Sequence, residues 1–212
     1  ITNDSSARTI TGSGTLETGR LMNDWQSSLT GMTGEIGSAV TGSPALNLSN
    51  SSAKTGSILQ VVQYVKTDTS STTSTTFGDI PGQGGGAGDF KVVLTPRDEN
   101  SKILLIADIK TGNTKDWFTH IRLENATTGT ALYIADAHSV RASDITRNMS
   151  SSELTTLSAV YLDSPSTSSS VTYRVQWRVE GQTAYINRTK DDTANTSYGR
   201  SASSLTAMEV AG

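Results

Sequence analysis

The sequence predicts an all-β protein built as an antiparallel β-sandwich. The first observation is the segment 171–179 (VTYRVQWRV), in which every odd position is apolar and every even position is polar. Such alternation is typical of a strand that buries one face and exposes the other. The second is a series of short apolar segments, separated by turn residues and without helical periodicity, that follows residue 56. Together they predict two facing antiparallel sheets.

The expected strands are short segments rich in β-branched and aromatic residues, bounded by Gly, Pro, Asn, Asp and Ser. They are 57–66, 75–79, 90–95, 102–109, 117–124, 131–135, 154–163, 171–180, 183–187 and 205–210. Turn or loop chemistry fills the gaps, as in 81–88 (PGQGGGAG) and 96–101 (PRDENS). The glycine run lacks the Lys-Ser/Thr ending of a phosphate-binding loop, so we expect a flexible connection there.

Two of these segments are apolar on both faces. Segment 103–106 is continuously apolar and 157–162 is nearly so, which predicts central strands that are covered on both sides. Only 34% of the 212 residues are hydrophobic and 6% are aromatic, so a monomer would have a thin interior. We therefore expect another copy of the chain to cover a second surface. The alternative is that loops of the same chain cover it.

Residues 1–54 differ in composition from the rest of the chain, being rich in Ser, Thr, Gly and Asn. Leu21, Trp25, Leu29 and Met32 have the spacing of a short amphipathic helix. We expect residues 1–54 to be an N-terminal docking arm or stalk and residues 55–212 to be a C-terminal β-sandwich head. A linker or mobile arm is the alternative for the first segment. Because the chain begins with Ile rather than Met, we also expect a processed or truncated product.

Charge and composition argue against several classes of function. Twenty acidic and 17 basic residues give a net charge of −3, which offers no electrostatic reason to bind nucleic acid. The chain has no cysteine, which excludes a disulfide scaffold and a thiolate metal site. No segment approaches the roughly 18 uninterrupted apolar residues of a membrane span, and no secretory signal opens the chain. We expect neither nucleic-acid binding nor membrane insertion.

Residues that could carry chemistry are few. His120 and His138 have no second His or Cys at metal-ligand spacing, so we expect surface histidines and no metal site. Paired carboxylates could hydrolyse glycosidic bonds. The candidates are Asp136, Asp144, Glu153, Asp163, Asp191 and Asp192. Adjacent carboxylates point to opposite faces of an extended chain, and no G-x-S-x-G nucleophile motif is present. We expect a protein that is not an enzyme and has no cofactor.

The remaining candidate residues belong to recognition surfaces. Tyr198 and Arg200 lie in the long loop 190–204, and Trp117 opens an expected strand. Aromatic rings beside polar groups suit contact with sugars or proteins, so these three residues form the predicted receptor-contact site. Tyr133 and Tyr185 also lie near strand ends. The alternative for Trp117 and Tyr133 is a place in the core or in a subunit interface.

Several phrases of the sequence resemble a known viral family when they are taken in order. They are GSILQVVQYVKTDTSSTTSTTFGDIPG (56–82), VVLTPRDENSKILLIADI (92–109), AVYLDSPSTSSSVTYRVQWR (159–178), AYINRT (184–189) and LTAMEVAG (205–212). Over about residues 56–212 they resemble the C-terminal domain of tail-fibre and other virion appendage proteins of marine bacteriophages. This chain departs from the family pattern by inserting QGGGAG after the DIPG turn.

The resemblance implies a jelly-roll-like sandwich, similar to C1q and tumour-necrosis-factor heads and assembled as a homotrimer, with 55–68 and 205–212 as terminal strands. It implies a virion protein, assembled in the host cytoplasm and carried on the extracellular particle, whose head attaches to a host surface glycan or protein. Residues 1–54 would bind other virion proteins. The alternatives are a head decoration, collar or adaptor protein with a purely structural role, a glycan-degrading enzyme, and an unrelated secreted C1q-like module.

Overall fold

The computed structural model describes residues 54–85, 89–114, 118–136, 144, 146–148 and 153–212. The chain divides into two units, residues 1–51 and 52–212, and the fold described here is that of the second unit. The expected helix around Trp25 and the docking role of residues 1–54 lie outside the described residues. Trp117 and His138 also lie outside them. Among the described residues, no helix has the length and apolar character needed to span a membrane.

The described part of the head consists of strands, with one short 3₁₀ turn at Gln83–Gly85. The strands are β1 (Ile58–Lys66), β2 (Ser70–Thr72), β3 (Gly78–Asp79), β4 (Lys91–Leu94), β5 (Lys102–Asn113), β6 (Thr119–Asn125), β7 (Thr130–Leu132), β8 (Thr146–Asn148), β9 (Thr155–Asp163), β10 (Val171–Val179), β11 (Ala184–Ile186) and β12 (Ser203–Val210). Every pairing between them is antiparallel. The prediction of an all-β, antiparallel fold is therefore confirmed.

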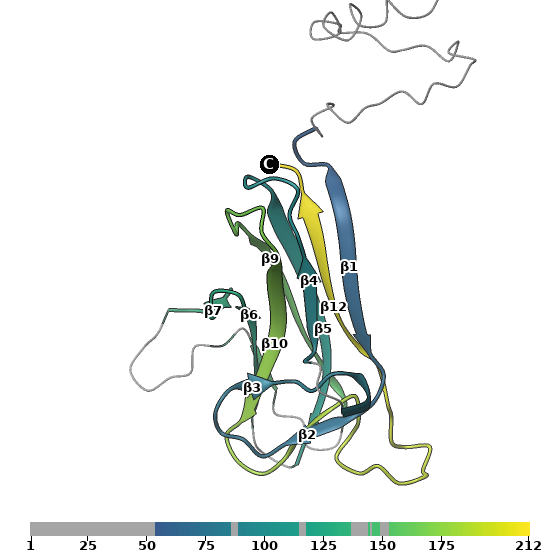
Figure 1. Cartoon of the computed structure of the whole chain (residues 1–212). Coiled ribbons are helices and arrows are strands. Elements are labelled where there is room, and N and C mark those ends of the chain that lie inside the picture. The colour runs from purple at the N-terminus through teal and green to yellow at the C-terminus, as the bar shows by residue number, and fades with distance from the viewer. Residues whose placement is uncertain (1–53, 86–88, 115–117, 137–143, 145, 149–152) are drawn as a thin grey trace, which may run out of the picture. The chain divides into compact units, whose positions relative to one another are not determined.

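The strands form two sheets of six (Figure 1). The first sheet has the order β1-β12-β5-β11-β2, and β9 pairs with β5. The second has the order β3-β10-β6-β7, with β4 paired to β10 and β8 paired to β6. As expected, segments 55–68 and 205–212 contain the first and last strands of the head, β1 and β12. These two strands also lie side by side, from the pair Ile58–Val210 to the pair Lys66–Ser203.

The alternation in segment 171–179 proves to be a buried face on β10. Val171, Tyr173, Val175, Trp177 and Val179 are all at most 3% exposed. They pack into one apolar cluster with side chains from the first sheet, among them Leu105 and Ile109. The core therefore lies between the two sheets, as the pattern predicts.

The sequence pattern missed two short strands, β2 and β8, and misjudged the length of a third. Both missed strands are three residues long and begin with Ser or Thr, so they show no apolar alternation. Strand β5 continues to Asn113, beyond the expected end at residue 109, because residues 111–113 pair with β11. Pairing with a strand distant in the sequence extends β5 where the local pattern predicts a turn.

The expectation that both doubly apolar segments are central strands is half right. Strand β5 is central, since it pairs with β12, β11 and β9. Among the described residues, strand β9 pairs only with β5 and lies at an edge of the sheet. Its side chains Val160 and Leu162 are 58% and 47% exposed. Within the described part of the chain, the apolar character of β9 therefore comes with exposed outward side chains and not with burial on both faces.

The first half of the glycine-rich connection is anchored. The backbone N–H of Gly84 donates to Asp68 Oδ2 at 2.8 Å, and the N–H of Gln83 donates to the Tyr64 hydroxyl at 2.6 Å. Lys66, whose side chain is fully buried, forms an ion pair with Asp68 at 2.5 Å and donates to the carbonyl of Gly82. Burial opposes ionisation of Asp68, but the contacts with Lys66 and Gly84 lower its pKa below the usual value. At Gln83 and Gly84 the connection is thus held in place, contrary to the expected flexible link.

Gly112 lies in the part of β5 beyond residue 109, and a substitution there tests how closely this part of the strand approaches residue 188. A Cβ at this position would lie 2.6 Å from the backbone oxygen of Arg188, so the chain would have to move to accept it. We expect Gly112→Ala to lower the free energy of unfolding by about 1–3 kcal/mol, the usual cost of overpacking. Gly78→Ala is the matched control, because no atom lies within 4 Å of its Cβ. Equal denaturant midpoints for the two variants would contradict the close approach of β5 to residue 188.

Candidate functional site

The loop between β11 and β12 contains two of the three predicted receptor-contact residues. Arg200 donates from Nε to Asp192 Oδ1 at 2.8 Å and from Nη2 to Asp192 Oδ2 at 2.6 Å. This bidentate contact fixes the plane of the guanidinium group. The hydrogen bond from Arg200 lowers the pKa of Asp192, and the same contact raises the pKa of Arg200. Arg200 is thus oriented while its side chain stays exposed.

Tyr198 lies in the same loop and is also exposed, at 36%. Its backbone N–H donates to the carbonyl of Asn195 at 3.1 Å, and the Asn195 side chain accepts from Ser197 N at 2.9 Å. These bonds form a local turn that carries the tyrosine. The loop also closes at its base, where Arg188 and Arg200 form an isolated β-bridge. Tyr198 and Arg200 therefore lie on one loop that hydrogen bonds and a β-bridge hold in place.

The other aromatic candidates occupy different places. Tyr133 is 54% exposed and stacks on Tyr161, with ring centroids 5.6 Å apart. A place for Tyr133 in the core of this chain is therefore wrong. Tyr185 lies below the guanidinium of Arg188, at 3.9 Å from the ring centroid. The third predicted contact residue, Trp117, lies outside the described residues.

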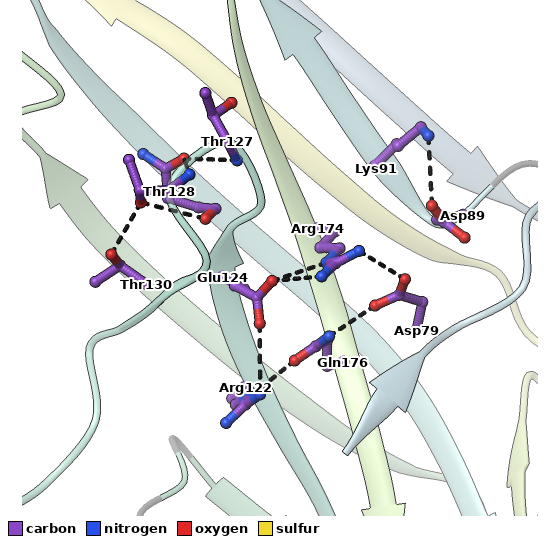
Figure 2. A network of polar contacts seen from close by, with 11 residues as sticks. Asp79, Asp89, Lys91, Arg122, Glu124, Thr127, Thr128, Thr130, Arg174 and Gln176 are labelled. Carbon is purple, nitrogen blue, oxygen red and sulfur yellow. Dashed lines mark hydrogen bonds and ion pairs between the residues drawn. The ribbon is translucent and has the colours of Figure 1, made fainter.

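The outer face of the second sheet carries a network of charged side chains (Figure 2). Arg174 donates to Glu124 Oε1 from Nε at 3.0 Å and from Nη2 at 2.5 Å, and to Asp79 Oδ2 at 2.7 Å. Gln176 donates to the other oxygen of Asp79 and accepts from Arg122 Nε, at 2.7 and 2.8 Å. Three strands, β3, β6 and β10, are joined by this network. Burial would lower the pKa of Arg174, but the contacts with Glu124 and Asp79 raise it.

Phe77 extends this polar face at its edge. The guanidinium of Arg122 lies 4.3 Å from the centre of the Phe77 ring, and that of Arg178 lies 5.4 Å from it. Each contact is within cation–π range. The alternation in β10 predicted polar outward positions, but the partners Asp79, Glu124 and Phe77 come from segments far away in the sequence. The network satisfies its own charges and cross-links strands, so its arrangement is structural.

His120 is buried, and the expectation of a surface histidine is wrong. It lies on the face of β6 opposite the core residue Ile121, as its position predicts, yet its side chain is 0% exposed. Asp144 contacts its Nδ1 atom and Glu180 lies 3.0 Å from its Nε2 atom. The covering residue Asp144 is 24 positions away in the sequence, so local alternation gives no sign of it. Because the two carboxylates lie against opposite edges of the ring, they do not converge on one metal position.

Three of the candidate carboxylates for glycoside hydrolysis, Asp144, Asp163 and Asp192, each have a different partner. Asp163 accepts a hydrogen bond from the buried Tyr173 hydroxyl at 2.6 Å. Burial and this carboxylate together raise the pKa of Tyr173. Asp144 contacts His120, and Asp192 pairs with Arg200, as described above. Within the described part of the chain, no group of three or more His, Cys, Asp or Glu residues is arranged to hold a metal ion.

Comparisons with known proteins give only distant structural similarities. No protein-family model matches the sequence, and no curated protein matches it. A structure of the Gx strain of infectious bursal disease virus is 8% identical, with a TM-score of 0.42 over 72% of this chain and 32% of that chain. A mutant VP2 protein of the same virus, in derived T=1 particles, is 9% identical, with a TM-score of 0.33 over 74% of this chain and 37% of that chain. The chain thus spans about a third of the length of these structures, and the similarity identifies no family.

Proposed function

We propose that this chain is a virion structural protein, the head of a tail fibre or appendage that attaches a bacteriophage to its host. The head is a homotrimer with a jelly-roll-like arrangement, and residues 1–54 bind other virion proteins. The resemblance of residues 56–212 to virion appendage domains supports this proposal. The observation that carries attachment is the presence, on one loop held by hydrogen bonds, of exposed Tyr198 and of an Arg200 whose orientation is fixed by Asp192.

The proposed ligand is a glycan or protein on the host surface. A tyrosine ring offers a flat apolar surface with a hydroxyl at its edge, and an oriented arginine offers paired donors to hydroxyl or carboxylate groups. A single such contact is weak. Three copies on one head would bind with the avidity of a multivalent ligand, so no deep pocket is required.

A second candidate function is that of a decoration, collar or adaptor protein that touches no receptor. The exposed outer face of β9, with Val160 58% exposed, favours this reading because it needs a protein partner. The two functions differ in whether the isolated protein binds cells. A third reading, glycan degradation, is tested by incubating the protein with host polysaccharide and assaying new reducing ends.

Adsorption of the isolated, labelled chain to host cells tests the attachment proposal. We expect binding to cells that the virus infects, and weaker binding by at least about tenfold for Tyr198→Ala, because aromatic anchors dominate contact surfaces. Tyr133→Ala is the matched control, since Tyr133 is also an exposed tyrosine but lies after β7. A wild-type chain that binds no host cell would favour the structural function. Equal losses in both variants would remove the β11–β12 loop as the contact site.

A further inference from the structure

The first sheet has a break at the point where β11 ends. Strand β12 pairs with residues 102–108 of β5, and β11 pairs with residues 111–113. Both lie on the same side of β5, since β9 pairs along its other side. The chain leaves the sheet after β11 and returns at the start of β12. We call residues 188–202 the contact loop, because they include Tyr198 and Arg200. Figure 1 shows this loop outside the strands, at the end of the head opposite to the C-terminus.

Asn187 lies at this break, and its side chain is fully buried. Its Nδ2 atom donates to the carbonyls of Lys66 at 2.7 Å and Asp68 at 2.9 Å, and its Oδ1 atom accepts from the Ser203 hydroxyl at 2.6 Å. Both hydrogens of the amide group are thus used. Its backbone N–H donates to the carbonyl of Lys110 at 2.9 Å. One residue therefore connects β1, β5 and β12 at the start of the contact loop.

The two acceptors of the Asn187 amide are themselves held in place. The buried Lys66 side chain forms an ion pair with Asp68 and donates to the carbonyl of Gly82. Asp68 also accepts from the backbone N–H of Gly84. Because these groups are fixed by one another, the side chain of Asn187 bonds to a rigid part of the head and can hold a loop against it.

The backbone of Asn187 closes the other end of the contact loop. Its φ is +63°, in the left-handed region that Asn adopts more readily than most non-glycine residues. Its carbonyl accepts from the backbone N–H of Ser201 at 3.2 Å. The isolated bridge between Arg188 and Arg200 lies directly beside this bond in the sequence. Both ends of the contact loop therefore meet at Asn187.

We propose that Asn187 is a positioning residue for host attachment: its side chain fixes the direction in which the contact loop leaves the head, and so places Tyr198 and Arg200 for the ligand. This inference rests on the proposed attachment function. Asn187 itself is buried and does not touch the ligand. The bonds from Arg200 to Asp192 and from Tyr198 to Asn195 orient parts of the loop but do not attach it to the sheet. A loop that is fixed before binding loses less conformational entropy when it binds, so a buried anchor raises affinity.

Asn187→Gly tests the positioning role. Glycine adopts a positive φ freely, so this variant keeps the backbone conformation and removes the hydrogen bonds of the side chain. We expect the full, labelled variant chain to bind host cells more weakly by at least about fivefold, at a temperature at which circular dichroism shows it folded. Glu209→Gln is the matched control. Glu209 is also buried and hydrogen-bonded in β12, but at the far end of that strand, so adsorption should stay unchanged.

A double-mutant cycle separates positioning from a general loss of stability. If Asn187 acts through Tyr198, adding Asn187→Gly to Tyr198→Ala should weaken adsorption by less than about twofold, a smaller factor than in the wild type. A purely structural role would give the same factor in both backgrounds. Hydrogen exchange gives an independent measurement. The amides of the contact loop should exchange at least about tenfold faster in Asn187→Gly, while those of residues 205–210 in β12 keep their wild-type rates.

Each result supports or overturns the inference. If the wild type binds host cells and Asn187→Gly binds them equally well, the positioning role is wrong and the attachment function is left intact. Equal factors in the two backgrounds, or unchanged exchange in the contact loop, also overturn the positioning role. A wild-type chain that binds no host cell overturns both proposals. If Asn187→Gly does not fold, Ser203→Ala takes its place with the same expected outcomes, because it removes the bond to Asn187 Oδ1 and leaves the backbone of residue 187 unchanged.

Discussion

Trp177→Ala should lower the free energy of unfolding by about 3–5 kcal/mol, the usual cost of truncating a buried tryptophan. Trp177 is 3% exposed and lies on the inner face of β10, opposite Ile121 of β6 in register. Removing the indole leaves a cavity between two sheets whose strand ladders resist collapse. For a domain of this size, the melting temperature should fall by roughly 6–20 °C. The loss is a large part of the free energy of unfolding of a typical domain, which is about 5–15 kcal/mol.

Thr172→Ala is the control for this prediction, because Thr172 lies on the same strand at an outward position. Its cost should stay below about 1 kcal/mol, the range of β-propensity effects. Melting curves must be compared at one protein concentration, since association of copies shifts the transition. A Trp177→Ala protein that melts with the wild type would mean that the two faces of β10 are assigned the wrong way round.

The strand pattern could be predicted from sequence where burial is one-sided. In β10 the alternation of apolar and polar residues reports directly which side chains meet the core, so both strand and face follow from it. The place of segment 157–162 in the sheet could not be predicted from its pattern. Apolar residues on both faces are expected of a central strand and equally of an edge strand whose outer face binds another protein. The pairing in the structure separates these cases, because β5 is the one strand that pairs with β9 in the part of the chain that the structure describes.

Side-chain partners could not be predicted, since they depend on which strands meet. The position of His120 in β6 predicts its face, but its burial depends on Asp144 and Glu180, which arrive from other segments. The same holds for Asp79 in the charged network, which reaches Arg174 from 95 residues away. By contrast, the bond between Asp192 and Arg200 spans eight residues within one loop. Sequence identified that loop as a contact candidate, although not the ion pair that orients it.

Glu209→Gln should lower the free energy of unfolding by about 1.5–3 kcal/mol at neutral pH, the range for hydrogen bonds to a charged group. Glu209 lies in β12 and is fully buried. Its Oε1 atom accepts from the backbone N–H of Arg97 and its Oε2 atom from Gln60 Nε2, both at 2.6 Å. A glutamine must turn its amide N–H₂ toward one of these donors. Gln60 cannot rotate to accept, because its Nε2 atom also donates to Thr95 O at 2.7 Å.

The effect of Glu209→Gln should depend on pH, with a sign set by the pKa of the carboxyl group. Burial alone would raise that pKa, but the donors from Arg97 and Gln60 lower it overall below its ordinary value. A pKa lowered by folding adds stability at pH values above the ordinary pKa of the carboxyl group, and this stability is lost as the pH falls through the folded-state pKa. The free energies of unfolding of the wild type and Glu209→Gln should therefore differ most near pH 7 and converge in acid, as measured by denaturant unfolding at each pH.

Glu99→Gln, at an exposed position of the β4–β5 turn, is the control and should follow the wild type at every pH. A difference between wild type and Glu209→Gln that stayed constant down to pH 3 would mean that the carboxylate charge of Glu209 contributes nothing, and that only its shape holds the turn to β12.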